Sequence, residues 1–202
     1  MKKNLGLFLC LVVISLSIAC QPASKEASEN ASNDAPAEKK FDVVGGNWLI
    51  KFPPPTDGSS PKNLEFRLLK DTNHPTLAED VTADATAMEL SSAAGFPANG
   101  KIYTYNGETI GYTSISGNTL QGLNRGQDGS APQSHTKGQA VYLITMQREL
   151  GDKTEYQMPQ LPDDYYVHYR WQTGSKENGD NGWGNFEMAG FAPGSASSAP
   201  PK

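Results

Sequence analysis

The sequence has few residues of the types that most often carry chemistry. Its 202 residues include only two cysteines, Cys10 and Cys20, and three histidines, His74, His135 and His168. The histidines are far apart, and none has the spacing of a metal-ligand motif. The sequence also lacks the P-loop, nucleophile-elbow and dinucleotide-binding patterns. These absences favour a protein that has no metal, no cofactor and no catalytic set.

Clusters of basic residues are absent as well. Lysine and arginine together number 17 against 22 aspartates and glutamates, which gives a formal net charge of −5. Such a chain gains little from the release of counterions by phosphate groups. The charge therefore predicts an acidic, solvated surface and no nucleic-acid partner.

Long hydrophobic runs are limited to one segment near the N-terminus. Residues 5–18 are nearly all apolar and follow Lys2 and Lys3. A run of this length is too short to span a bilayer comfortably, but it suits the hydrophobic region of a signal peptide. Residues 1–19 are therefore predicted to be a signal peptide.

The predicted signal peptide ends directly before Cys20. The stretch Ile18-Ala19-Cys20 resembles the lipobox of bacterial lipoproteins, although Ser17 stands where that motif usually has leucine. The resemblance implies acylation of Cys20, and Gln21 implies the outer membrane as the location, on its periplasmic or surface face. The alternative is an ordinary cleaved signal peptide that leaves Cys20 as a free thiol. Because Cys10 leaves with the signal peptide, no other thiol remains.

Two segments contain too little apolar surface to fold. Residues 20–40 and 194–202 are rich in alanine, serine and proline, and they contain no aromatic residue and no valine, isoleucine or leucine. Such segments cannot offset the entropy lost on ordering. We expect a lipidated, disordered tether at 20–40, a folded body from residue 41 and a disordered tail at 194–202.

The body has the pattern of an all-β protein. Strands are predicted at 48–52, 64–68, 88–90, 102–105, 109–115, 119–123, 141–144, 165–171 and 185–191. Alternation of apolar and charged residues indicates that 64–68 is a half-buried strand, and Asn106-Gly107 is a strong hairpin signal. Frequent turns between short strands favour a small antiparallel barrel or sandwich.

One third of the chain, within the body, resembles a known family. The blocks that carry the resemblance are Gly95-Phe96-Pro97, residues 107–112, residues 120–129 and residues 135–138. Together they resemble a small β module that recurs in tailed-phage virion and tail-associated proteins, here spanning 77–144. In a lipoprotein, this resemblance implies either a prophage origin or reuse of the module by a host.

The module would divide the body into three parts. N-terminal strands occupy 41–76, the module 77–144 and a C-terminal aromatic hairpin 145–193. Strands at 165–191 could pair with those at 47–52 and 63–69, in which case the module is inserted into a second small sheet.

Two groups of residues are candidates for a site. Glu108, Arg125, Gly126 and His135 are interpreted as a structural loop: the arginine ties loop carbonyls or pairs with Glu108, Gly126 takes a positive φ, and His135 bonds loop backbone. The alternative for Arg125-Gly126 is a catalytic or carboxylate-binding role.

The second group is aromatic and consists of Tyr165, Tyr169, Trp171 and Trp183. These side chains could stack on a sugar ligand, or they could pack the core of a small sheet.

The leading functional hypothesis is a membrane-anchored, non-enzymatic binding or structural module whose partner is another envelope or phage protein. The alternatives are a prophage-encoded superinfection-exclusion lipoprotein, an envelope carbohydrate-binding protein and a hydrolase with an unrecognised site.

Overall fold

The structure, a computed structural model, describes residues 41–56, 58–71, 73–173 and 183–195, and over these ranges the chain is all-β. The strands are β1 (Phe41–Val44), β2 (Asn47–Lys51), β3 (Asn63–Lys70), β4 (Ala87–Glu89), β5 (Gly100–Thr104), β6 (Thr109–Tyr112), β7 (Ser114–Ser116), β8 (Thr119–Gln121), β9 (Asn124–Gln127), β10 (Val141–Gly151), β11 (Glu155–Pro159), β12 (Tyr165–Gln172) and β13 (Glu187–Ala192). The predicted fold class is confirmed. The predicted signal peptide, Cys20 and the tether lie outside the described residues.

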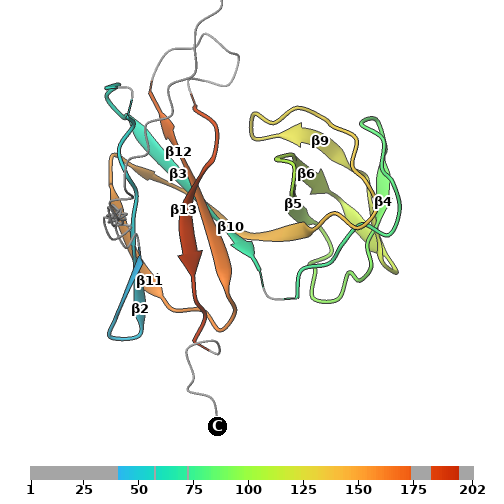
Figure 1. The fold of residues 1–202 in the computed structure, drawn as a ribbon, viewed down its shortest axis with the longest axis horizontal. Coiled ribbons are helices and arrows are strands. Elements are labelled where there is room, and N and C mark those ends of the chain that lie inside the picture. The colour runs from blue at the N-terminus through green and yellow to red at the C-terminus, as the bar shows by residue number, and fades with distance from the viewer. Residues whose placement is uncertain (1–40, 57, 72, 174–182, 196–202) are drawn as a thin grey trace, which may run out of the picture. The chain divides into compact units, whose positions relative to one another are not determined.

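Antiparallel pairing organises these strands into three sheets. The largest has the order β13-β12-β3-β10-β5-β6-β9, and the two smaller ones are β1-β2-β11 and β4-β8-β7 (Figure 1). None of the three closes into a barrel within the described ranges.

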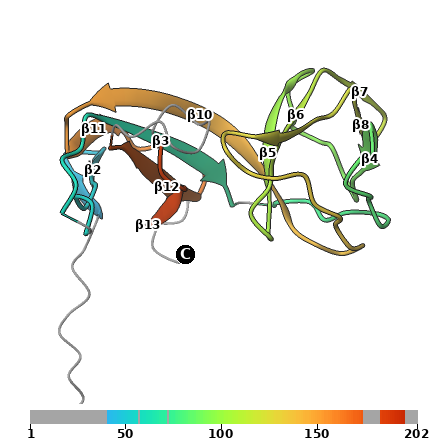
Figure 2. The ribbon, with the colours of Figure 1, turned by 90° about the horizontal axis from the view of Figure 1, so that it is seen from above.

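The long strand β10 joins the two halves of the seven-stranded sheet. Its first residues, Val141–Ile144, pair with β5, and from Leu143 to Gly151 it pairs with β3. Figure 2 shows β10 running alongside β3 and continuing to β5. The strand thus crosses the predicted boundary after residue 144, so the module and its surroundings share one hydrogen-bonded ladder.

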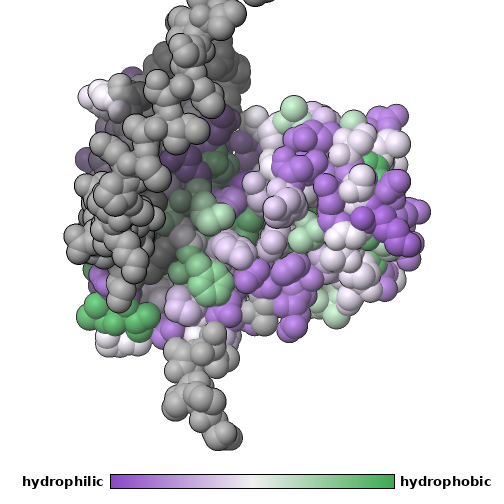
Figure 3. All heavy atoms as spheres, in the orientation of Figure 1, coloured by the Kyte–Doolittle hydropathy of each residue, from purple (hydrophilic) through white to green (hydrophobic). Residues whose placement is uncertain are grey.

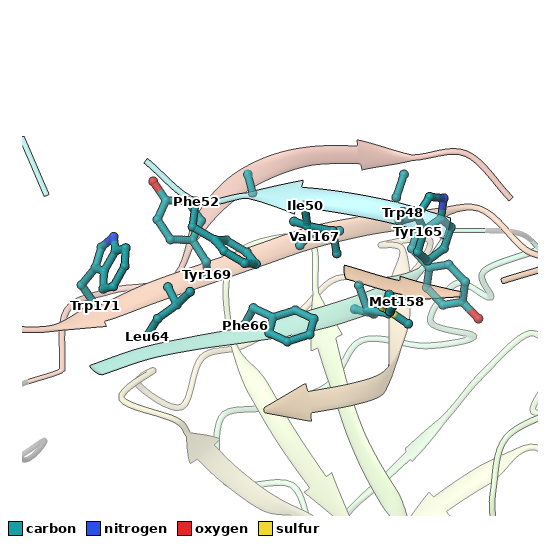
Figure 4. Packing of buried hydrophobic residues seen from close by; sticks show 13 residues of the cluster. Trp48, Ile50, Phe52, Leu64, Phe66, Met158, Tyr165, Val167, Tyr169 and Trp171 are labelled. Atoms are coloured by element: carbon teal, nitrogen blue, oxygen red, sulfur yellow. The ribbon is translucent and has the colours of Figure 1, made fainter. Parts of the chain in front are cut away.

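The first hydrophobic core lies between this sheet and the sheet β1-β2-β11. Alternate residues of β3 and β12 point into it, and β2 and β11 contribute residues from the opposite side. The labelled side chains in Figure 4 come from these four strands and from Phe52, which directly follows β2, and they pack against one another. Ring contacts such as Trp48 on Tyr165, with centroids 5.9 Å apart, fix their orientation.

A second core lies within the predicted module. It contains buried side chains from β4, β5, β6, β8 and β10, together with Leu77, Val81 and Leu90. The predicted return strand 109–115 is divided here. The chain leaves the large sheet after Tyr112 and enters the small sheet at Ser114, so β6 and β7 belong to different sheets.

Of the two strand pairings predicted for the segment 165–191, the one with 63–69 is present. β12 pairs with β3 along its whole length, from Tyr165 opposite Lys70 to Gln172 opposite Asn63. β2 does not join this ladder. It pairs with β1 and β11 instead and contributes to the same core.

Three predictions are corrected at the level of single elements. The segment 64–68 is not half-buried, because Glu65 and Arg67 are buried on the second face of β3. The strands β1, β9 and β11 were missed. The predicted tail begins too early, since the Gly194 amide donates to Asp164 Oδ1 and the Ser195 amide to the Leu161 carbonyl.

Candidate binding site

The side of the large sheet opposite the first core carries polar and aromatic side chains. Since side chains alternate along a strand, the residues of β3 and β12 that do not enter the core point to this side. In the ladder His168 lies opposite Arg67, and Arg170 lies opposite Glu65. This face forms the floor of the candidate site.

Arg67 is the most deeply buried charge on this face, with 1% of its surface exposed. Its Nη1 donates to Thr109 Oγ1 at 2.8 Å, and its guanidinium carbon lies 3.8 Å from the Phe186 ring centroid and 4.7 Å from that of Tyr103. Asp128 Oδ2 is 3.9 Å from Nη1, an ion pair too long for a hydrogen bond. Burial lowers the pKa of Arg67 to about 10, so the guanidinium stays charged at neutral pH.

Asp128 connects this floor to the loop after β9. Its Oδ1 accepts from Lys101 Nζ at 2.8 Å, and its carbonyl accepts from Arg170 Nη1 at 2.9 Å. Asp128 has a φ of 54°, a left-handed conformation that aspartate and asparagine tolerate better than most residues. The loop therefore holds the Asp128 carboxylate at a fixed place beside Arg67.

An aromatic depression of about 300 Å³ opens on the same face. It is lined by Tyr103, Tyr105, Tyr142, Tyr166, Phe186 and Met188, with Leu69 and His168 completing the lining. Tyr105 at its rim is 73% exposed and Met188 is 57% exposed. Figure 3 shows apolar surface gathered over the middle of β13, the strand that contains Met188, between hydrophilic patches.

A smaller polar pocket of about 170 Å³ adjoins the depression. Arg67, Thr109, Asp128, Ser130 and Asn185 line it, and it shares Tyr103 and Phe186 with the depression. Arg67 Nε and Asp128 Oδ2 are buried away from the pocket surface and have no hydrogen-bond partner among the described residues. The floor thus combines a charged donor, a carboxylate acceptor and aromatic rings.

The predicted structural-loop residues come together elsewhere, around the Glu108 carboxylate. Arg125 donates to both Glu108 oxygens, at 2.9 and 2.8 Å, and to the carbonyls of Thr82 and Gln133. The Gly126 amide donates to Oε1 at 3.0 Å. Gly126 has a φ of +62°, and a Cβ there would lie 2.6 Å from Pro132 Cδ, so both the conformation and the space require glycine.

His135 differs from its expected role, because its ring bonds a carboxylate rather than loop backbone. Its Nε2 lies 2.6 Å from Glu108 Oε2. Burial alone would raise the pKa of Glu108, but the hydrogen bonds from Arg125, His135 and two amides outweigh it and hold that pKa below its usual value. An ionised carboxylate only accepts, so His135 Nε2 is the donor. Both side chains are fully buried.

The predicted aromatic group does not form an exposed platform. Tyr165, Tyr169 and Trp171 are buried in the first core (Figure 4), so they offer little ring surface to a ligand. Trp183 is half-buried, and the Arg170 guanidinium carbon lies 5.1 Å from its ring centroid. Tyr165, Tyr169 and Trp171 therefore pack the core of the sheet, which was the second of the two interpretations of this group.

Sequence reasoning therefore missed the residues that line the depression. The alternation of side chains along β12 could have indicated some of them. Because Tyr165, Tyr169 and Trp171 lie on one face of the strand, the residues between them lie on the other face, namely Tyr166, His168 and Arg170. Tyr103 and Tyr105 carried no comparable signal, because their surroundings depend on segments far away in the chain.

Comparisons with known proteins return nothing: no family model, no curated protein and no solved structure matches this chain. In the described ranges, no helix is long and apolar enough to cross a membrane. Within the same ranges, no group of three or more His, Cys, Asp or Glu side chains is placed to hold a metal ion.

We predict that Arg125→Ala destabilises the fold strongly. The substitution leaves the buried Glu108 charge without its main partner, which typically costs about 3–5 kcal/mol. Chemical denaturation followed by tryptophan fluorescence measures the free energy of unfolding. Arg148→Ala, at an exposed arginine of β10, is the matched control and should change it by less than about 0.5 kcal/mol. An unchanged midpoint for Arg125→Ala would contradict the structural role of this cluster.

We further predict a pH dependence of stability that comes from His168. Burial, assisted by the charge of Arg67, lowers the pKa of His168 from 6.5 to about 4. The unfolded state therefore binds this proton first as the pH falls below 6.5, so the folded state loses stability down to about pH 4. Between pH 7 and 4.5 the loss amounts to about 2 kcal/mol. His168→Gln should remove this part of the slope in urea titrations at the two pH values, and an identical slope in both proteins would refute the assignment.

Proposed function

We propose that this chain is a lipid-anchored envelope protein that binds carbohydrate in the aromatic depression and does not catalyse a reaction. The observation that carries the proposal is the depression itself. It combines exposed and half-buried aromatic rings with hydrogen-bonding groups in its floor. Sugar rings offer apolar C–H faces to aromatic rings and hydroxyl groups to polar partners, so they match both kinds of lining.

The shape of the site favours a sugar over a protein partner. Stable protein interfaces bury about 800 Å² on each side around a tightly packed centre. Among the described residues of this face, the large exposed apolar side chains are Tyr105, Met188 and Phe191. A local depression with a polar floor is better suited to a small, hydroxyl-rich ligand.

The anchor part of the proposal rests on the sequence. The apolar run 5–18 and Ile18-Ala19-Cys20 predict export and acylation, and the composition of residues 20–40 predicts a tether. A flexible segment of about 20 residues reaches roughly 25 Å in root-mean-square terms. The body would therefore stay close to the membrane surface, where envelope polysaccharides are abundant.

The non-catalytic part of the proposal is supported by the Glu108 cluster. An acid and a histidine 2.6 Å apart are a familiar catalytic combination, but here both side chains are fully buried. The carboxylate also accepts from Arg125 and from the amides of Gly126 and Gln133. These bonds fix the loop conformation, which is a structural role.

We predict that Cys20→Ser releases the protein from the membrane. Acyl chains supply about 0.8 kcal/mol per buried CH₂, and a serine hydroxyl is not the sulfur that the lipobox reaction requires. The measurement is membrane fractionation with incorporation of a labelled fatty acid into the wild-type chain. Wild type should be labelled and sediment with membranes, whereas Cys20→Ser should be neither. An unlabelled wild-type protein would overturn the anchor.

We also predict that Tyr105→Ala weakens binding of envelope glycans. Loss of one stacking ring is worth about 0.5–1.5 kcal/mol, which corresponds to about a 2- to 13-fold fall in affinity. A glycan array identifies the ligands, and calorimetry with the best oligosaccharide measures their affinity. Tyr105→Phe keeps the ring and should retain most of the affinity.

The control for this series is Val43→Ala, at an exposed residue of β1 that does not line the depression. It should bind like wild type. If the wild-type protein retains no glycan, the proposed function is wrong.

A further inference from the structure

A row of aromatic rings crosses the strands on the face that carries the aromatic depression. Tyr142 of β10 lies against Tyr166 of β12, with ring centroids 5.8 Å apart, and Tyr166 in turn lies against Phe191 of β13, at 5.5 Å. In the ladder of β10 and β5, Tyr103 is directly opposite Tyr142, and Tyr105 follows in the β5–β6 loop. The row therefore runs across the sheet from β5 to β13.

The row is longer than the depression. Phe191 is not part of the lining of the depression, but it contacts Tyr166, which is. Three strands separate β13 from β5, and neighbouring strands lie about 4.8 Å apart, so the row spans about 19 Å between the two backbones. Each end carries an exposed ring, since Tyr105 is 73% and Phe191 42% exposed. A ligand seated in the depression can therefore continue along the row beyond it.

The rings in the middle of the row are half-buried and held by neighbouring side chains. Tyr103 packs edge-on against His168, with centroids 5.0 Å apart, and the guanidinium carbon of Arg67 lies 4.7 Å from the Tyr103 centroid. Tyr142 packs against His74, with centroids 4.8 Å apart. Rings that are already fixed lose little freedom when a ligand binds. The middle of the row is thus preorganised for binding.

The row repeats two kinds of contact along its length. The ring planes differ by 86° between Tyr142 and Tyr166 and by 65° between Tyr166 and Phe191, so ring faces alternate with ring edges. The tyrosine hydroxyls can donate and accept hydrogen bonds. Polar groups that reach the solvent flank the row, namely His74 beside Tyr142 and Asp71, whose carboxylate lies 3.4 Å from His74 Nδ1. Stacking and hydrogen bonding are therefore available at several successive positions.

We infer that this row binds a linear, extended polysaccharide that runs across the strands, with several successive sugar units in contact with the protein. This inference rests on the proposed carbohydrate binding and names its ligand class. A chain of β-1,4-linked pyranoses is straight and offers C–H faces and hydroxyl edges at every unit, so it repeats what the row repeats. The depression holds the middle of the bound stretch, and Tyr105 and Phe191 contact units on either side. A site for a single terminal sugar would be confined to the depression.

The first test is the dependence of affinity on chain length. The probes are β-1,4-linked oligomers of glucose and of N-acetylglucosamine, from dimer to hexamer, measured by calorimetry against the full mature chain carrying Cys20→Ser. We expect affinity to rise by about 2- to 13-fold for each further ring engaged, after correction for the number of registers open to a longer chain. The rise should end once the oligomer covers the row.

Two results would overturn the inference, and they differ in what they mean for carbohydrate binding. Equal corrected affinities from dimer to hexamer would exclude the extended site while leaving carbohydrate binding intact. Failure of both series to bind would also exclude it. If a wider glycan array then retained nothing, the proposed function would be wrong as well.

Phe191→Ala tests the end of the row that lies outside the depression. We expect it to weaken the hexamer by about 2- to 13-fold and to leave the dimer, which occupies the depression, unchanged. Phe191→Tyr keeps the ring and should bind both oligomers like wild type, as should Val43→Ala on β1. Equal effects of Phe191→Ala on dimer and hexamer, or no effect on either, would contradict the extended site.

The double variant Tyr105→Ala/Phe191→Ala tests whether one chain contacts both ends. Because the two residues lie at opposite ends of the row, their separate losses in hexamer affinity should multiply. Both side chains are exposed, so the variants should melt like wild type, which shows that the losses do not come from unfolding. In a site confined to the depression, the double variant would lose no more affinity than Tyr105→Ala alone, and that result would overturn the inference.

Discussion

The burial of β3 on both of its faces is the constraint on which the rest of the molecule depends. One face supplies Leu64, Phe66 and Leu68 to the first core, which is the expected use of alternating apolar residues. The other face carries Glu65 and Arg67, and covering it withdraws two charges from water. Buried charges persist only with partners, so strands on both sides of β3 must supply them.

Those partners explain how distant segments are fixed around one point. The Glu65 carboxylate accepts hydrogen bonds from Arg170 of β12 and Gln147 of β10. Arg67 donates to the Thr109 hydroxyl of β6, and its guanidinium lies against the rings of Tyr103 and Phe186. Replacement of this arrangement by apolar side chains could be equally stable, since desolvation offsets much of the attraction between buried ions. That a charged floor is kept beneath an aromatic depression is consistent with a binding role.

The contrast between the two candidate groups shows what a sequence can reveal. Glu108, Arg125 and His135 stand next to turn signals, and the turns themselves bring them together: Gly107 closes the β5–β6 loop just before Glu108, and Gly126 follows Arg125. For Arg67, by contrast, the sequence pattern led to the wrong prediction. A charged residue alternating with leucine and phenylalanine predicts a solvent-facing position. What buries it is Phe186 and the Asp128 loop, and no local pattern links these to β3. The polar strand β9 was missed for a similar reason, because only its pairing with β6 makes it a strand.

The β5–β6 hairpin finally connects the rigid and the exposed parts of the site. Asn106-Gly107 lies in the turn as predicted, but the loop contains three residues, Tyr105–Gly107, and is closed by the Thr104 amide donating to the Glu108 carbonyl. This length places Tyr105 at the tip and Glu108 inside, where Arg125 and His135 hold its carboxylate. The rim tyrosine is thus attached to one of the most strongly constrained residues of the fold. The backbone that carries Tyr105 is therefore fixed by the Glu108 cluster, whereas the ring itself is 73% exposed, so in the proposed binding function the cluster would set the position of the rim rather than the rotamer of the ring.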